Sequence, residues 1–498
     1  MRGKVVLFYP AYEGPPLSAP LCLLSLASTL KAADFEVVVI DAAIEPGYKE
    51  RVLKEAADAL CLGISLLTGP MIQGAIEVAT AAKQLLPNLP VIFGGWHPSL
   101  LPDQTLNEHF VDAVVRGQGD LTLLEVAEAL GEGRSIEAVL GVSWKSDSHK
   151  QHNPERPVQR LESLPTPAFE LVDFDAYERA CGVRKLAYAT SVGCPYACNY
   201  CTDMVFYKRR FNALSAERVV GELACLVVRY RIEEVALLDS NFPVDVHRAL
   251  EIARGIVDSG VKFRWTFQAS TDFLCRMSED EVRVLGQSGV SHMGFGTEST
   301  SEGVLKLMNK RHQRVNEMFE TARKAQLAGI RVTFNLIFGY PGETEADRVT
   351  TFRTMSEIAR QFRNVSFSPN IFTPYPGIPI WPQLRTLGVR EPKSLLEWMN
   401  MPLGANLLPW LQGKELARLQ RMLDYFLLNS EIYRTRGSYP LLRRGVRRIV
   451  QAPVRWRLRS SRYFFPWELW LARTTERVAL RRSLVTGQEL PTQAASTC

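Results

Sequence analysis

The stretch Gly193-Cys194-Pro195-Tyr196-Ala197-Cys198-Asn199-Tyr200-Cys201 places three cysteines in the spacing Cys-x3-Cys-x2-Cys. A cubane iron–sulfur cluster normally takes four thiolates. Three thiolates therefore leave one iron without a protein ligand, and that iron is open to a small molecule that chelates through an amino group and a carboxylate. The sequence predicts a 4Fe-4S cluster held by Cys194, Cys198 and Cys201, which we assign as both metal ligands and catalytic residues.

A structural zinc site and a disulfide with one spare thiol are the two alternatives for these cysteines. Zinc favours four ligands, and the next histidine, His247, is too far along the chain to be assigned from spacing. Disulfides are typical of oxidising compartments, whereas no apolar signal stretch opens this sequence and a cytoplasmic location is expected. The pattern therefore favours the cluster.

The cysteine loop resembles that of the radical S-adenosylmethionine (radical SAM) superfamily, whose members carry Cys-x3-Cys-x-aromatic-Cys. Tyr200 supplies the aromatic residue, and we count it among the candidate cofactor-binding residues. The resemblance implies that the open iron binds the methionine end of S-adenosylmethionine. It also implies an electron donor, such as flavodoxin or ferredoxin, as a partner.

Residues 181–390 alternate strand and helix patterns around this loop. Strands are expected at Lys185–Thr190, Glu234–Asp239, Phe263–Ala269, His292–Glu298, Val332–Phe338 and Val365–Phe372. Helices are expected at Ala216–Tyr230, Val246–Gly260, Ser278–Ser288, Ser301–Leu307, Val315–Ala328 and Glu345–Phe362. Six β/α units predict a partial (β/α)6 barrel, a fold whose chemistry lies at the carboxyl ends of the strands. The cysteine loop follows the first expected strand.

Polar or glycine residues also end the next four expected strands: Asp239, Ser270, Glu298 and Gly339. By the same resemblance, Ser270 and Glu298 hold the ribose or amino-acid part of S-adenosylmethionine, and Gly339 lets the backbone approach the adenine. Two alternatives stay open. Asp239 could shape a turn instead of touching a ligand. The pair Glu343-Thr344, which follows Gly339 in the same loop, could simply start the next helix, where a carboxylate is favourable.

Residues 1–145 predict a separate doubly wound, Rossmann-like domain. Short apolar strands are expected at Val5–Tyr9, Phe35–Ile40, Ala59–Ser65, Val91–Gly94 and Ala113–Arg116. Helices are expected at Leu21–Lys31, Lys49–Ala59, Pro70–Leu86 and Leu121–Leu130. This alternation is typical of a parallel sheet, whose ligands bind at the carboxyl ends of the strands. A structural or nucleotide-binding sheet is the alternative, but no Gly-x-Gly-x-x-Gly opens a helix after the first strand.

The loops after these strands resemble the cobalamin-binding domain that precedes many radical SAM barrels. The resemblance rests on the phrases Gly63-Ile64-Ser65-Leu66-Leu67-Thr68-Gly69, Gly94-Gly95-Trp96-His97-Pro98 and Arg116-Gly117-Gln118-Gly119-Asp120. It implies that cobalamin is bound by Ser65, Leu66, Thr68, Gly94, Gly95 and Gly117.

The expected cobalamin has no lower histidine ligand. Many cobalamin proteins carry Asp-x-His-x-x-Gly, and here Ala43 stands in the place of that histidine, after Asp41. The fused radical enzymes commonly lack the histidine as well. For His97 we expect a hydrogen-bonding or packing role rather than cobalt ligation.

The remaining regions are a proline-rich linker, residues 146–180, and a mostly helical C-terminal region, residues 391–498. The whole chain has 498 residues and a net charge of +6, but residues 434–482 hold fourteen Arg and only two acids, which gives that segment +12. Large aromatics are interleaved with these arginines: Trp456, Tyr463, Phe464, Phe465, Trp467 and Trp470. Inward packing of the aromatics, contact with anionic lipid and contact with nucleic acid stay open as explanations. No nucleic-acid motif accompanies the charge.

The two resemblances together imply a cobalamin-dependent radical SAM enzyme. A carbon–hydrogen bond without acidity cannot be opened by a side-chain base, so a radical route is required. The main hypothesis is a methyltransferase acting on an unactivated carbon of a small, amphiphilic or lipid substrate, located in the cytoplasm with peripheral contact to the inner membrane face. The alternatives are a cyclase or rearrangement enzyme that moves no methyl group, and a non-catalytic cobalamin-binding protein.

Overall fold

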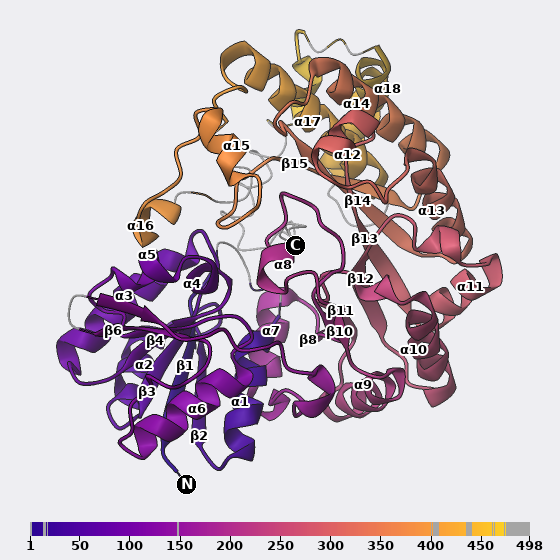
Figure 1. Cartoon of the computed structure of the whole chain (residues 1–498). Coiled ribbons are helices and arrows are strands. Elements are labelled where there is room, and N and C mark those ends of the chain that lie inside the picture. The colour runs from indigo at the N-terminus through magenta and orange to yellow at the C-terminus, as the bar shows by residue number, and fades with distance from the viewer. Residues whose placement is uncertain are drawn as a thin grey trace. The chain divides into compact units, whose positions relative to one another are not determined.

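The computed structural model describes residues 2–12, 16, 18–146, 149–399, 401, 408–434, 441–460, 462, 464–472 and 474 (Figure 1). The contacts divide the chain into two compact units. The first unit contains Met1–Phe267 and Thr373–Ala405, and the second contains Gln268–Phe372 and Asn406–Cys498. This grouping differs from the predicted domains 1–145, 146–180, 181–390 and 391–498, because the predicted barrel contributes to both units.

The first unit begins with a seven-stranded sheet in the order β2-β1-β3-β4-β5-β6-β7. Five strands pair in parallel: β1 (Lys4–Tyr9), β2 (Glu36–Asp41), β3 (Cys61–Ser65), β4 (Val91–Gly94) and β5 (Ala113–Val115). The antiparallel strands β6 (Val142–Ser146) and β7 (His149–His152) extend this sheet. The strand order reverses between β1 and β3, which is the position where such sheets bind ligands.

Helices cover both faces of this sheet, as the doubly wound prediction requires. The helices are α1 (Leu21–Ala32), α2 (Tyr48–Ala56), α3 (Met71–Leu85), α4 (Trp96–Leu100), α5 (Pro102–Leu106) and α6 (Asp120–Gly131). In β1, Val5 and Leu7 belong to the core formed with α1 and α6. The alternate residue Phe8 stacks on Tyr48 of α2 at 5.5 Å between ring centroids. Successive residues of a strand point to opposite faces, so both faces of the sheet are buried.

The short helices α4 and α5 and the helix α7 (Phe174–Cys181) were not predicted, and α7 lies in the expected linker. Helices α4 and α5 are too short to show a 3.6-residue period. Helix α7 did carry a local signal, because the Asp173 side chain accepts a hydrogen bond from the Ala176 amide at 2.9 Å. Aspartate is a preferred N-cap residue.

The first unit continues with the opening strands of the predicted barrel. Its elements are β8 (Lys185–Tyr188), β9 (Ser191–Val192), α8 (Asp203–Phe206), β10 (Asn212–Ala213), α9 (Ala216–Tyr230), β11 (Glu234–Leu237), α10 (Val246–Ser259), β12 (Arg264–Ala269), α15 (Trp381–Thr386) and α16 (Leu395–Trp398). Strand β11 pairs in parallel with both β8 and β12. Helix α9 begins where predicted because the Ser215 hydroxyl accepts from the Arg218 amide, and its apolar face, including Val219 and Leu223, is buried.

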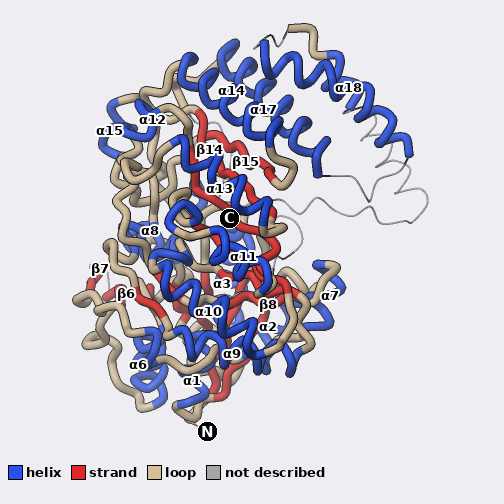
Figure 2. Tube along the Cα trace, turned by 90° about the vertical axis from the view of Figure 1, so that its right-hand side faces the viewer, coloured by secondary structure: helices blue, strands red, loops and turns tan. Residues whose placement is uncertain are grey.

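The second unit contains the later strands and the C-terminal helices. Its elements are α11 (Glu279–Gln287), β13 (Val290–Glu298), α12 (Glu302–Leu307), α13 (Val315–Leu327), β14 (Arg331–Phe338), α14 (Glu345–Gln361), β15 (Val365–Ile371), α17 (Gly413–Arg434) and α18 (Leu441–Ser460). Strand β14 pairs in parallel with β13 and β15. Phe426 of α17 contacts Phe352 and Phe367, at 5.3 and 4.9 Å between ring centroids. Figure 2 shows α14, α17 and α18 as neighbours in this unit.

The alternation β8-α9-β11-α10-β12-α11-β13-α13-β14-α14-β15 contains the six predicted β/α units. The predicted α/β fold class is confirmed: a doubly wound sheet, six β/α units and a helical C-terminal region.

Candidate cofactor sites

The cysteine loop lies between the two strands of a small antiparallel hairpin, β9 and β10. Within it the Cys201 amide donates to the Cys198 carbonyl at 3.2 Å. Cys198 is buried, and Cys194, Tyr200 and Cys201 are half-buried. The Ile380 amide donates to the Asn199 carbonyl at 3.2 Å, so the segment 373–405 of the first unit fixes the loop from outside.

Gly193, immediately before the first cysteine, is required by geometry. Its φ is +77°, and a Cβ atom at this position would overlap the Arg210 carbonyl oxygen and approach Tyr207 Cβ to 3.0 Å. A positive φ is unfavourable for residues with a side chain. Because a backbone carbonyl cannot rotate away as a side chain can, only glycine fits where the hairpin opens into the cysteine loop.

Asp239 fastens the chain just before the loop. Its Oδ1 accepts from the Thr190 amide at 2.9 Å, and its Oδ2 accepts from the hydroxyls of Thr190 and Ser191 at 2.6 and 2.5 Å. Burial raises the pKa of Asp239, and these hydrogen bonds oppose the rise. Arg248 donates to the Thr190 carbonyl at 3.0 Å. Asp239 therefore positions the chain at the end of β8, which is close to the turn-shaping role named as an alternative. Its contact with a cofactor stays a prediction.

Asp203, two residues after Cys201, is a site residue that the sequence analysis missed. It is buried, and the Ser240 hydroxyl donates to its Oδ1 at 2.5 Å. Burial raises the pKa of Asp203, while hydrogen bonds from Ser240 and the Cys194 backbone oppose the rise. Asp203 therefore links the loop to the chain that follows β11. This role could not be inferred from the sequence, because Ser240 lies 37 residues further along the chain.

The donor set of the loop fits an iron–sulfur cluster. Burial raises the pKa of the Cys201 thiol to about 12, and the negative charge of Asp203 adds to the rise. Cluster iron binds thiolate, so binding must displace this proton. Within the described ranges, no three His, Cys, Asp or Glu side chains are grouped to hold one metal ion. In a cubane each thiolate binds a different iron, so the three sulfurs need not meet at one point.

The predicted cobalamin-binding residues follow β3, β4 and β5 and lie at one edge of the first sheet. The Ser99 hydroxyl links two of these loops, because it donates to the Gly95 carbonyl at 2.6 Å and accepts from the Gly117 amide at 3.0 Å. Gly95 has a φ of +90°, and a Cβ there would lie 2.9 Å from the Leu66 backbone. At Gly117 no other atom lies within 4 Å of a Cβ position. This edge is therefore packed at Gly95 and open at Gly117, which is compatible with a ligand approaching the backbone.

The other predicted residues of this edge differ in exposure. Leu66 is fully buried, and its amide donates to the Gly94 carbonyl at 2.9 Å. Ser65 and Thr68 are half-buried. Any contact of Leu66 with cobalamin therefore requires rearrangement of this packing, whereas Ser65 and Thr68 keep accessible surface. All of these cobalamin contacts remain predictions.

His97 has the packing and hydrogen-bonding role that was expected. It is fully buried, its Nδ1 lies 2.9 Å from the Thr68 hydroxyl, and its ring meets Trp398 edge-on at 5.9 Å between centroids. Burial lowers the pKa of His97 to about 3, so the imidazole is neutral at physiological pH.

The turn after β2, where Ala43 replaces a histidine, is closed by Asp41. Its Oδ1 accepts from the Ala43 amide at 2.8 Å, and its Oδ2 accepts from the Tyr177 hydroxyl at 2.5 Å. Burial raises the pKa of Asp41. Asp41 thus joins α7 to the first sheet, which sequence spacing did not indicate.

The cobalamin-type loop and the cysteine loop meet within the first unit. Trp96, which begins α4, packs on Phe206 at 4.3 Å and on Tyr207 at 5.9 Å between ring centroids. Phe206 ends α8, which starts two residues after Cys201. An aromatic contact of this kind adds about 0.5–1.5 kcal/mol beyond the area that it buries. Two regions that the sequence could only place in separate domains are therefore joined by direct packing.

A second set of candidate residues lies in the second unit. Glu298 ends β13 with a φ of +60°, beside a register shift between β13 and β14 at Gly296/Glu298. Lys310 donates to Glu298 Oε1 at 3.0 Å, and both side chains are buried. A Cβ at Gly296 would lie 2.8 Å from Glu298 Oε1. Bulges and left-handed non-glycine residues are enriched at functional sites, which supports the predicted role of Glu298. Lys310 was not predicted.

Ser270 follows β12 and is buried in the second unit. Its hydroxyl donates to Asp272 Oδ1 at 2.6 Å, so a local turn orients the side chain. Its contact with S-adenosylmethionine stays a prediction.

Gly339 has a reason to be glycine that differs from the expected approach to adenine. Its φ is +76°, and a Cβ would lie 2.8 Å from Leu411 Cδ2. Its amide donates to Glu343 Oε2 at 2.5 Å, and its carbonyl accepts from Trp410 Nε1 at 3.0 Å. Gly339 therefore packs against Trp410 and Leu411, which precede α17, and its contact with adenine remains a prediction.

The alternative that Glu343-Thr344 starts the following helix is confirmed for Thr344 but not for Glu343. Thr344 is the N-cap of α14, in a capping box with Asp347. Glu343 instead faces inward, with 1% of its side chain exposed, and lies 3.5 Å from Arg348. Burial raises the pKa of Glu343 to about 7, while Gly339 and Arg348 oppose the rise.

We expect Glu343 to make the stability of the second unit depend on pH. Its pKa in the folded protein is about 7, against an ordinary value of 4.5. The unfolded chain therefore loses this proton first, and stability falls as the pH rises from 4.5 to 7, by about 3 kcal/mol. Glu343→Gln should remove this fall. Urea-unfolding midpoints of both proteins between pH 5 and pH 8 test it, and parallel pH profiles would contradict the prediction.

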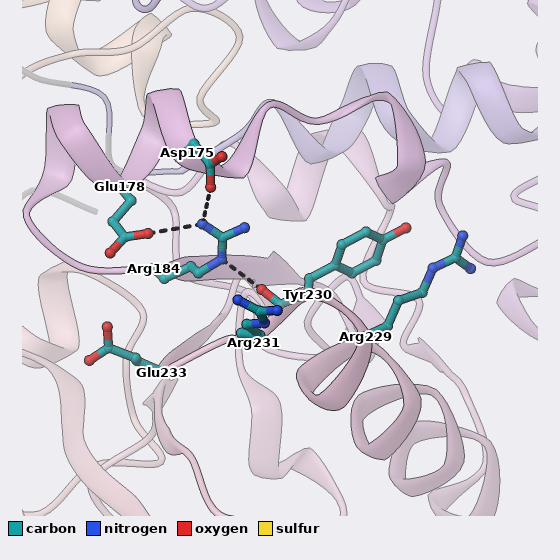
Figure 3. A pocket seen from close by; sticks show the side chains of 7 residues that line it. All are labelled: Asp175, Glu178, Arg184, Arg229, Tyr230, Arg231 and Glu233. Atoms are coloured by element: carbon teal, nitrogen blue, oxygen red, sulfur yellow. Dashed lines mark hydrogen bonds and ion pairs between the residues drawn. The ribbon is translucent and has the colours of Figure 1, made fainter.

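A surface hollow of about 640 Å³ in the first unit is separate from these sites (Figure 3). It lies beside Arg184, at the amino end of β8, whereas the cysteine loop follows the carboxyl end of that strand. The Arg184 guanidinium is paired with Asp175 and Glu178 and donates to the Tyr230 carbonyl at 2.7 Å. The positive charge of Arg184 is neutralised by Asp175 and Glu178, so we do not assign the hollow as a candidate active site.

Two family models match the chain. Residues 4–127 match the B12 binding domain, and residues 188–355 match the radical SAM superfamily. The "Uncharacterized methyltransferase PH0819" of Pyrococcus horikoshii is 31% identical over 394 residues, which cover 76% of this chain and 82% of the relative. The anaerobic magnesium-protoporphyrin IX monomethyl ester cyclase of Rubrivivax gelatinosus is 23% identical, over 76% of this chain and 70% of the relative.

Among solved structures, the cobalamin-dependent S-adenosylmethionine radical enzyme OxsB, with aqua-cobalamin and S-adenosylmethionine bound, has a similar fold. The TM-score is 0.75 at 15% sequence identity, over 99% of this chain and 82% of that chain.

The protein is a radical SAM enzyme that carries a cobalamin-binding domain. It belongs to the cobalamin-dependent radical SAM family, which includes methyltransferases. The predicted cofactors, a 4Fe-4S cluster, S-adenosylmethionine and cobalamin, are those of this family, and a small-molecule substrate and a reductant accompany them. Which residues contact each cofactor remains as predicted above.

Proposed function

We propose that this enzyme transfers a methyl group to an unactivated carbon of a small molecule. The observation that carries the proposal is the packing of Trp96 on Phe206, at 4.3 Å between ring centroids. It joins the cobalamin-type loop after β4 to the helix that follows Cys201. Methyl transfer to a carbon radical requires the methyl donor and the source of the radical in one reaction space.

The chain's own residues would hold and orient the cofactors. When bound, the cluster with S-adenosylmethionine would supply radical chemistry and cobalamin would supply methyl-transfer chemistry, so the cofactors would carry the difficult steps. Gly193, Asp239 and Asp203 fix the course of the cysteine loop. The half-buried ring of Trp96 and its contacts with Phe206 and Tyr207 would limit the access of water to the junction between the loops.

For the substrate we propose an amphiphilic molecule, and for the reductant a flavodoxin or ferredoxin. The support for an amphiphilic substrate is the combination of exposed aromatics with the arginine-rich segment 434–482. The support for an external reductant is the reaction itself, because the open cluster must receive one electron before it can pass one on.

The test follows methyl-labelled S-adenosylmethionine in the anaerobically reconstituted enzyme with cobalamin and reduced flavodoxin. We expect label in cobalamin together with S-adenosylhomocysteine, and slow release of 5′-deoxyadenosine even without the substrate. In Cys198→Ala, 5′-deoxyadenosine should fall to background while cobalamin binding is retained. Absence of both S-adenosylhomocysteine and 5′-deoxyadenosine from the wild-type enzyme would refute the proposal.

A cyclase that transfers no methyl group is the second candidate, favoured by the similarity to the magnesium-protoporphyrin ester cyclase. The same experiment separates the two. A cyclase would form 5′-deoxyadenosine while no label enters cobalamin.

A further inference from the structure

The C-terminal helices of the second unit present large apolar side chains to solvent. The exposed fraction is 81% for Phe465, 68% for Trp470 and 66% for Phe464. We define the C-terminal apolar cluster as Phe464, Phe465, Trp467 and Trp470, four exposed residues close together in the sequence. Soluble proteins rarely expose apolar surface of this kind without a binding function.

A buried ion pair holds the turn that carries two of these residues. Arg457 Nε donates to Glu468 Oε1 at 2.7 Å, and Tyr425 of α17 donates to Glu468 Oε2 at 2.8 Å. Arg457 also donates to the carbonyls of Phe464 and Phe465 at 2.5 and 2.7 Å. The turn is therefore anchored to α17 through its backbone, while its two rings stay outside.

The backbone of this turn is strained at Phe465. Its φ is +53°, and a left-handed conformation costs a residue with a side chain roughly 1–2 kcal/mol. Strain of this kind persists only where the surrounding structure imposes it, and it is typical of functional sites.

The helical turn that follows has an inverted pattern. Glu468 and Leu469 are buried, with exposed fractions of 1% and 6%, whereas Trp467 and Trp470 are exposed. Residues three apart share one face of a helix. The carboxylate therefore points inward and the two indoles outward, which is the reverse of a surface helix in water.

The charge around the cluster identifies the chemistry of its partner. Residues 434–482 hold fourteen Arg and two acids, and Glu468, one of those acids, is consumed by the buried ion pair. Arg448 and Arg462 are exposed within the described part of this segment. Cationic side chains interleaved with Trp and Phe are typical of surfaces that bind anionic lipid headgroups. None of the described helices is long and apolar enough to cross a membrane.

We propose that the C-terminal apolar cluster docks peripherally on an anionic lipid bilayer. Phe464, Phe465, Trp467 and Trp470 enter the headgroup region, and Arg448 and Arg462 contact lipid phosphates. The proposal does not rest on methyl transfer, because it concerns where the enzyme is held and not which bond it forms.

Flotation of the full-length holoenzyme with vesicles tests the proposal. We expect binding to phosphatidylcholine vesicles that contain phosphatidylglycerol, and much weaker binding to phosphatidylcholine alone. The double variant Phe465→Ser/Trp470→Ser should lower the vesicle partition coefficient at least tenfold, since each ring loses a buried apolar surface. Arg462→Gln should lower it about fivefold, and added salt should weaken wild-type binding.

The matched control is Leu327→Ser, which removes another exposed apolar side chain of the same unit, with 53% of it exposed. It should bind vesicles as the wild type does. Circular dichroism and 5′-deoxyadenosine release identify variants that fold normally, so a folding defect cannot be mistaken for lost binding.

Three results would overturn the proposal. They are wild-type protein that does not float with anionic vesicles, a double variant that binds them as the wild type does, and equal binding to both vesicle types. A dimer that becomes monomeric in the double variant, without vesicle binding, would assign the cluster to self-association. Binding of a DNA oligomer lost in the same variant, again without vesicle binding, would assign it to nucleic acid.

Discussion

Gly193→Ala is expected to abolish cluster binding. A Cβ atom would overlap the Arg210 carbonyl oxygen at a residue whose φ is +77°. The positive φ alone costs about 1–2 kcal/mol. The overlap adds to this cost, because the β9–β10 hairpin must open to relieve it. Iron and sulfide content after anaerobic reconstitution should fall roughly tenfold or more, since each 1.4 kcal/mol is a factor of ten, and 5′-deoxyadenosine release should fall with it.

Gly182→Ala is the matched control for Gly193→Ala. Gly182 has a φ of +72°, but nothing lies within 4 Å of its Cβ position. It therefore carries the same backbone penalty without the overlap, and its iron content should equal that of the wild type. Cobalamin binding by Gly193→Ala reports whether the first sheet still folds. Normal iron content in Gly193→Ala would show that the hairpin adjusts and that our account of this glycine is wrong.

Lys310→Met is expected to be strongly destabilising and to weaken S-adenosylmethionine binding. Lys310 Nζ lies 3.0 Å from Glu298 Oε1, with side-chain exposures of 9% and 10%. Removing one partner of a buried ion pair is destabilising by about 3–5 kcal/mol. The free energy of unfolding should fall by that amount. Equilibrium binding of S-adenosylmethionine should weaken as well, because Glu298 loses the contact that orients it.

The double variant Glu298→Gln/Lys310→Met separates the pair from its surroundings. It should recover most of the lost stability, since no charge is left buried alone, but not the affinity for S-adenosylmethionine. Lys306→Met, at an exposed lysine of α12, controls for the loss of a positive charge. Equal stability of Lys310→Met and the wild type would contradict the predicted cost. Normal affinity would show that Glu298 does not bind the ligand.

Local patterns were sufficient for most of the helices and strands in the first 372 residues. Helix α9 matches its expected bounds, and β13, β14 and β15 lie within two residues of theirs. The reason is that strand and helix periods and N-cap residues such as Ser215 and Thr344 act over a few residues. Short helices such as α4 escape prediction because they show no period.

The C-terminal region was predicted least well. The sequence predicted a mostly helical region over residues 391–498, in which the structure places α17 at Gly413–Arg434. Inward packing of the interleaved aromatics, one of the three open explanations, is contradicted for five of them, because Trp456, Phe464, Phe465, Trp467 and Trp470 are all exposed. Tyr463 lies outside the described residues. The sequence could not distinguish buried from exposed aromatics here, because burial depends on which residues pair in space. Arg457 and Glu468 form a buried ion pair, and no local pattern marks either residue as buried.

The sequence by itself determined the class of enzyme, because the motif of three cysteines within eight residues is local and predicts an open iron–sulfur cluster without any distant partner. It also determined the two classes of β/α domain, since the pattern of each strand and helix is local. Only the tertiary structure decided which polar groups support the site. Asp239 is 49 residues from Thr190, and Asp203 is 37 from Ser240. Trp96 contacts Phe206 within one unit, although the sequence placed the two residues in separate domains. Such contacts depend on how the chain returns to itself in space, and no spacing rule along the sequence encodes them.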